Sequence, residues 1–95
     1  MKKVSDFSIS DAANCFGIDG QIIASACDTT ILFLLNDAGD NSNFWFGDAA
    51  NCISESGSFG TAEEAIADRI DGGCDVIVFD DHQEMASYIL ENDLR

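Results

Sequence analysis

The stretch TAEEAIADRIDGGCDVIVF, residues 61–79, has the clearest structural pattern in the chain and decides the fold. Thr61 precedes Glu64 by three residues, which is the capping-box spacing at a helix N-terminus. Apolar residues then recur at helical spacing as far as Ile70. The pair Gly72-Gly73 ends this pattern, because glycine readily adopts the left-handed conformation common after a helix. The sequence therefore predicts a helix between Thr61 and the glycine pair.

The segment after this helix, Cys74–Phe79, predicts a strand. It is rich in β-branched residues and apolar on both faces, as in a strand in the interior of a sheet. Asp81 and Glu84 then repeat the cap spacing, and Met85 and Ile89 follow at helical positions. The end of the chain is thus predicted as helix, strand, helix.

The first half of the chain predicts strands. Gln21–Cys27 and Thr29–Asn36 are expected to pair around a tight turn near Asp28. A third strand is expected to begin with Asn43–Gly47 and to run on to Ser54. These segments form a predicted antiparallel β-meander.

The fold class follows from the order of these elements. A short helix is also expected at Ser10–Phe16, ended by Gly17. Together the elements predict an α+β fold: an antiparallel β-meander followed by α-β-α, with the helices packed on one face of a single sheet. The 95 residues are expected to form a single domain, residues 1–95.

The pentapeptide DAANC occurs twice, at Asp11–Cys15 and at Asp48–Cys52. Alignment of the two copies places Gly20 opposite Gly57 and matches little else. The first copy precedes predicted strands and the second precedes a predicted helix, whereas a duplicated module repeats its order of elements. We interpret the repeat as coincidental; two Asp–Asn clusters brought together on the surface are the alternative.

The chain is strongly acidic. Eighteen Asp and Glu residues face four Lys and Arg residues, giving a formal net charge of −14. The bases are Lys2, Lys3, Arg69 and Arg95. Such a field disfavours approach to nucleic acid or anionic lipid and favours a basic partner. Simple solubility, or adaptation to high salt, is the alternative interpretation.

The sequence contains no membrane or export pattern. The longest apolar run, Ile31–Leu35, is too short to span a bilayer. No apolar stretch follows Lys2 and Lys3, so no signal peptide is predicted. We expect a soluble, cytoplasmic protein, whose four cysteines (at 15, 27, 52 and 74) are buried free thiols.

One short segment, DDHQE at Asp80–Glu84, brings a histidine together with several carboxylates. It follows a predicted strand, and ligand sites favour the ends of strands in α/β sheets. Asp80, Asp81, His82 and Glu84 are therefore a candidate metal or catalytic cluster. The favoured interpretation is helix capping by Asp81 and Glu84, because acids are stabilised at helix N-termini.

No other pattern indicates catalysis. Nucleophilic catalysis needs a base near the nucleophile, and the sole histidine, His82, has no cysteine close to it in sequence. The chain has no glycine-rich phosphate loop, and the polar loop Asp37–Asn43 lacks the calcium-loop spacing. We expect a non-enzymatic protein without cofactor or bound metal.

Two surface patterns suggest partner binding. Glu64, Asp68, Asp71 and Asp75 recur at helical spacing, with neighbours four residues apart lying about 6 Å from each other. This resembles the spacing of phosphates along a nucleic-acid strand, although Arg69 is expected to screen the acids partly. A solvated helix face is the alternative interpretation.

The second pattern is Phe44-Trp45-Phe46. In a strand, Phe44 and Phe46 share one face and Trp45 points to the other. One face belongs to the core. Trp45 is then either covered by a helix or exposed as an interface anchor, a role in which tryptophan is enriched.

The density of acids on a small domain resembles the nucleic-acid mimics of phages and mobile elements, which include anti-CRISPR proteins, restriction inhibitors and inhibitors of DNA glycosylase. The resemblance implies a cytoplasmic inhibitor in a bacterial cell, encoded by the host or a phage, whose carboxylates occupy the basic channel of a nucleic-acid-processing protein. It implies no direct binding of nucleic acid, and leaves monomer and homodimer open. The residues expected to contact the partner are Asp37, Asp40, Trp45, Glu63, Glu64, Asp68, Asp71 and Asp75.

A second resemblance is local. The segment Phe59–Ala65, FGTAEEA, follows predicted strands and resembles the N-terminal domain of HicB-type antitoxins, where a meander leads into a G-x-T-x-E-E-A-like helix start. This resemblance implies an acidic antitoxin that neutralises a small basic RNase. A further cassette domain of a mobile element, without either activity, is the remaining alternative.

Overall fold

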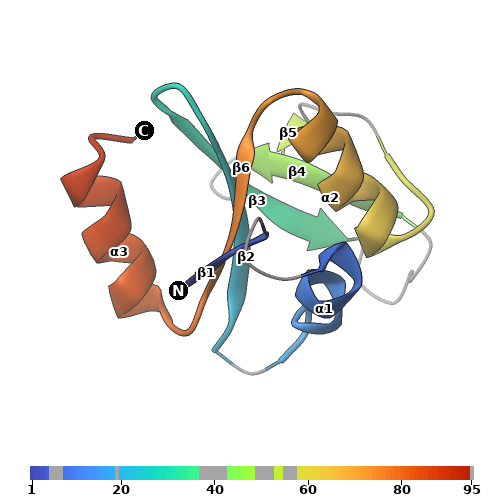
Figure 1. Cartoon of the computed structure of the whole chain (residues 1–95), viewed down its shortest axis with the longest axis horizontal. Coiled ribbons are helices and arrows are strands. Elements are labelled where there is room, and N and C mark those ends of the chain that lie inside the picture. The colour runs from blue at the N-terminus through green and yellow to red at the C-terminus, as the bar shows by residue number, and fades with distance from the viewer. Residues whose placement is uncertain (5–7, 19, 37–42, 49–52, 55–57, 95) are drawn as a thin grey trace.

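The computed structural model describes residues 1–4, 8–18, 20–36, 43–48, 53–54 and 58–94. They form one antiparallel sheet with helices packed against it, so the predicted α+β class is confirmed (Figure 1). The strands are ordered β1-β6-β2-β3-β4-β5. The elements in chain order are β1 (Lys2–Lys3), α1 (Ile9–Asn14), β2 (Ile22–Cys27), β3 (Thr30–Asn36), β4 (Phe44–Asp48), β5 (Ile53–Ser54), α2 (Ala62–Asp71), β6 (Asp75–Phe79) and α3 (His82–Glu91).

The meander forms as expected. Strands β2 and β3 pair antiparallel, with Cys27 opposite Thr30. Between them Asp28 has φ 55°, a left-handed conformation that Asp tolerates better than most residues and that a two-residue hairpin turn requires. Strand β3 then pairs with β4 in the same antiparallel sense, with Leu35 opposite Trp45.

The third strand is shorter than predicted. The expectation that it runs on to Ser54 is wrong, because β4 ends at Asp48 and β5 returns antiparallel beside it. Gly47 lies opposite Ser54, and Asp48 lies opposite Ile53. The residues between these two strands, 49–52, lie outside the described residues.

Strand β6 lies in the interior of the sheet, as its two-sided apolar sequence predicted. It pairs antiparallel with β2 on one side, where Ile23 lies opposite Val78. On its other side it pairs with β1, where Lys3 lies opposite Ile77. No sequence pattern indicated β1, because a strand of two lysines has no apolar pattern.

The helices cover both faces of the sheet. Val76 and Val78 of β6 belong to the buried cluster under α1 and α2, whereas Ile77 and Phe79 belong to a separate cluster under α3. The predicted single-face arrangement therefore holds for α1 and α2 only, and α3 packs on the opposite face (Figure 1). The physical reason is the alternation of β6, which presents apolar side chains on both faces, and both need cover.

Each helix begins at a side chain that accepts a backbone hydrogen bond. Thr61 Oγ1 accepts from the N–H of Glu64 at 3.1 Å, and Asp81 Oδ1 accepts from the N–H of Glu84 at 2.8 Å, which confirms both predicted caps. The N-terminal helix α1 is capped in the same way by Ser8 and is shorter than the predicted Ser10–Phe16.

Candidate functional site

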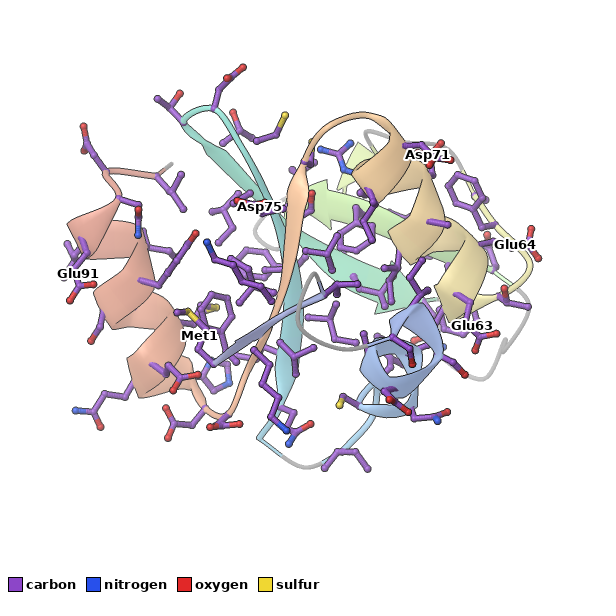
Figure 2. All side chains as sticks on the ribbon, in the orientation of Figure 1. Met1, Glu63, Glu64, Asp71, Asp75 and Glu91 are labelled. Atoms are coloured by element: carbon purple, nitrogen blue, oxygen red, sulfur yellow. The ribbon has the colours of Figure 1, made fainter. Side chains whose placement is uncertain are left out.

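The outward face of α2 carries four exposed carboxylates. Ala62, Ala65 and Ile66 are buried against the sheet and fix the rotation of the helix about its axis. At 100° per residue this rotation turns the intervening carboxylates to solvent. We call this surface the acidic face of α2; its exposed members are Glu63, Glu64, Asp68 and Asp71 (Figure 2).

The positions of these acids differ in what they do for the helix. Glu63 and Glu64 lie in the first turn, where the helix dipole favours negative charge, and Glu64 Oε1 also accepts from the Thr61 hydroxyl at 3.3 Å. Asp71 is the last residue of α2, where the dipole disfavours a carboxylate. The carboxylate of Asp71 is therefore not explained by helix stability.

Arg69 lies on the opposite side of the helix from these acids. Its Nε donates to Ser25 Oγ at 3.0 Å, and its Nη2 donates to Cys74 Sγ at 3.5 Å. The expectation that Arg69 sits beside the acids is therefore wrong. The sequence contained the signal, since Arg69 follows Ala65 by four residues and so belongs to the buried side of the helix.

Asp75 does not continue the acidic face. It is the first residue of β6, because the helix ends at Asp71 and the chain reverses through two glycines. It alternates in phase with Ile77, which faces α3, so its side chain lies on the other side of the sheet from α2 (Figure 2). The predicted helical spacing that linked Asp75 to Glu64 is therefore wrong.

Trp45 is also separated from the acidic face. Its partner in the ladder is Leu35, and Phe44 and Phe46 on either side of it belong to the cluster under α2. Trp45 therefore lies on the α3 face of the sheet, where it is half-buried. Its indole Nε1 is buried without a hydrogen-bond partner in the described part of the chain.

The remaining predicted partner-binding residues, Asp37 and Asp40, lie outside the described residues. Of the eight predicted residues the structure thus brings together Glu63, Glu64, Asp68 and Asp71 on one helix face.

In the cluster Asp80–Glu84, Asp81 caps helix α3, and Asp80 and Glu84 form ion pairs with the N-terminal ammonium. The ammonium group of Met1 lies 2.6 Å from Glu84 Oε1 and 3.4 Å from Asp80 Oδ2. The hydrogen bond from this ammonium, followed by one from the Asp80 N–H, lowers the pKa of the Glu84 carboxyl below its ordinary value. Within the described ranges, no three His, Cys, Asp or Glu side chains are grouped so that they could hold a metal ion.

Sequence reasoning missed two features of this structure. One is the contact of the N-terminus with α3, which depends on the pairing of β1 with β6. The other is a group of Ser25, Cys27, Arg69 and Cys74 beneath the end of α2, which depends on the register of β2 against β6. Neither register is encoded in a local pattern, so no signal in the sequence could have found them.

In the described part of the chain, no helix has the length and apolar character needed to cross a membrane. Comparisons of this chain with protein-family models, with curated proteins and with solved structures found no match.

Proposed function

We propose that this protein is a non-enzymatic inhibitor that binds a basic nucleic-acid-processing protein through the acidic face of α2. The carboxylates of that face take the place of phosphates in the partner's basic groove. The observation that supports the proposal most is the segregation of charge on α2. Its acids point to solvent, whereas its one cation, Arg69, points inward to Ser25 and Cys74.

The spacing of the acids fits this role. Glu64 and Asp68 are one helical turn apart, which separates their side chains by about 6 Å. A groove lined by Lys and Arg accepts a row of anionic oxygens by charge and hydrogen bonding, whether these belong to phosphates or to carboxylates. Contacts of this kind weaken as salt rises, because screening and counterion binding compete with them.

The formal net charge of −14 adds long-range attraction to a basic partner. The position of Asp71 supports the proposal further. A carboxylate at a helix C-terminus is disfavoured by the dipole, so its presence there is better explained by binding than by stability.

The test compares two variants that remove equal charge from different places. The first, E63Q/E64Q/D68N/D71N, neutralises the acidic face of α2. The matched control, D28N/D75N/E91Q/D93N, neutralises four exposed acids elsewhere. Both remove four negative charges from the formal −14, so they change long-range attraction equally.

Each protein is immobilised, exposed to bacterial lysate and washed at stepped salt, and the retained proteins are identified by mass spectrometry. We expect the wild type and the control to retain a nucleic-acid-binding protein that added duplex DNA displaces. The first variant should bind it at least about 4-fold more weakly, since each of four lost surface ion pairs costs about 0.2–1 kcal/mol. Equal loss in both variants, or retention that DNA does not displace, contradicts the proposal.

The antitoxin reading is the second candidate. The meander β2–β4 precedes helix α2, which Thr61 caps. An antiparallel bridge between Phe44 and Phe59 holds the start of β4 beside the residues just before this helix. This is the element order that the resemblance to HicB-type antitoxins implies. The same capture experiment separates the two candidates, because an antitoxin retains one small basic RNase and inhibits its cleavage of RNA.

A further inference from the structure

Two cysteines meet at the end of the ladder between β2 and β6. In this ladder Ser25 lies opposite Val76, and Ala26 lies opposite Asp75. The same antiparallel register places Cys27 opposite Cys74, one residue beyond the last of these pairs. Residues directly opposite each other in antiparallel strands have Cα atoms about 4.5–5.5 Å apart, which lies within the range that a disulfide spans.

Both thiols lie on the α2 face of the sheet, beside Arg69. Arg69 Nη2 lies 3.5 Å from Cys74 Sγ. Its Nε donates to the hydroxyl of Ser25, which is fully buried and holds the guanidinium in place. The contact places a positively charged donor directly beside the Cys74 sulfur.

The two thiols are also hydrogen-bonded to each other. This hydrogen bond to Cys74, followed by burial, raises the pKa of the Cys27 thiol above its ordinary value. The Cys74 side chain therefore interacts with both the guanidinium of Arg69, which donates to its sulfur, and the thiol of Cys27.

Cys74 also borders a cavity. A cavity of about 290 Å³ opens beside Cys74. Ile9, Ile70 and Val76 line it together with Lys3. Cys27 and Cys74 are each half-buried, so both are partly accessible.

We propose that Cys27 and Cys74 form a redox-active dithiol that closes to a cross-strand disulfide. Cys74 is the attacking thiolate, Cys27 is the resolving thiol, and Arg69 is the positioning residue that stabilises the thiolate. This site is independent of the acidic face of α2.

The reaction balances with hydrogen peroxide as the oxidant. The Cys74 thiolate attacks the O–O bond, forming a sulfenic acid and releasing hydroxide. The Cys27 sulfur then attacks the Cys74 sulfur, the S–O bond breaks, and water leaves with the Cys27 proton. The two sulfurs lose two electrons together, and the peroxide is reduced to water and hydroxide.

The first test treats the reduced full-length protein with hydrogen peroxide at a one-to-one ratio. We expect a mass loss of about 2 Da and, after proteolysis without reductant, a peptide that joins Cys27 to Cys74. The C15S variant is the control and should behave as the wild type. A disulfide through Cys15 or Cys52 instead, or none, overturns the proposal.

The second test assigns the roles of the two sulfurs. In the C27S variant the sulfenic acid cannot be resolved, so dimedone should label Cys74 after peroxide treatment. In the C74S variant the labelling of Cys27 should be at least about 10-fold slower, because Cys27 lacks the guanidinium contact. Equal labelling of both positions overturns the assignment of Cys74 as the attacking thiolate.

The third test concerns Arg69. R69Q should slow alkylation of Cys74 by iodoacetamide about 5-fold near neutral pH and shift its pH profile upward, because the cation that favours the thiolate is lost. R69K keeps the charge and should restore most of the rate. An unchanged pH profile in R69Q contradicts the positioning role.

Discussion

Helices α2 and α3 have the same length of ten residues and the same kind of N-cap, yet the two faces of the sheet bury them differently. In α2, Ala62, Ala65 and Ile66 are buried, and the last two are fully inaccessible. In α3 no residue is buried, and Leu90 is 82% exposed.

The difference follows from the size of the residues at each interface. The alanines of α2 allow its backbone to approach the sheet closely, so the aromatic residues Phe44 and Phe46 of β4 can enclose it. The larger Met85, Tyr88 and Ile89 of α3 remain half-buried over a smaller cluster. Two helices with comparable amphipathic patterns can thus be bound to one sheet with unequal strength.

The largest expected loss of stability comes from truncating an apolar side chain that packs a helix against the sheet. Ile66→Ala should lower the free energy of unfolding by about 3 kcal/mol, because it leaves a cavity in a fully buried site. Ile89→Ala, the same change on the half-buried face of α3, should cost about 1 kcal/mol. Urea denaturation of both variants measures the difference, and equal losses would contradict the inequality of the two faces.

The caps provide a second comparison. Thr61→Ala and Asp81→Ala each remove one N-cap hydrogen bond and should cost about 1 kcal/mol. We expect Thr61→Ala to lower global stability, since α2 opens only when its core opens. Asp81→Ala should mainly reduce hydrogen-exchange protection within α3, which is free to open locally. If Asp81→Ala reduces the protection of all amides equally, α3 belongs to the same cooperative unit as α2.

The smallest expected effect is the pH dependence of the contact between Met1 and Glu84. The ammonium lowers the pKa of Glu84 from 4.5. The carboxylate's contribution to folding stability is therefore complete above pH 4.5 and is lost as pH falls through the lowered pKa. The pKa of the N-terminal ammonium is raised from 8.0, first by its hydrogen bond to Glu84, so that contribution is lost as pH rises through the raised value.

The variant E84Q makes this contact measurable. The urea midpoints of wild type and E84Q should differ most between pH 4.5 and 8.0 and should converge outside this window. A difference that is constant with pH would mean that Glu84 acts through packing alone.

The two halves of the chain differ in how far their sequence predicts their structure. Helix α2, strand β6 and helix α3 were predictable because Thr61, the glycine pair and Asp81 act within a few residues of themselves. Strands β1 and β5 were not predictable, because two residues are too few to show an alternating pattern. Each forms by pairing with a longer strand, β1 with β6 and β5 with β4.

The candidate site shows the same division. The exposure of Glu63, Glu64, Asp68 and Asp71 follows from the helical period alone. The placement of Asp75 and Trp45 on the other face of the sheet depends on where α2 ends and on how β4 pairs with β3. Long-range pairing of this kind fixes the proximity of Cys27 to Cys74 as well, and it cannot be deduced from spacing in the sequence.

The short strands at the two edges of the sheet have a consequence for how the protein associates. An unpaired edge strand is a template on which another chain can add a strand, and long exposed edges lead to aggregation. Here the edges are β1, of two lysines, and β5, of two residues. Within the described residues, neither strand is long enough to offer the run of backbone groups that strand addition requires. Partners of this protein are therefore expected to recognise its side chains rather than to extend its sheet.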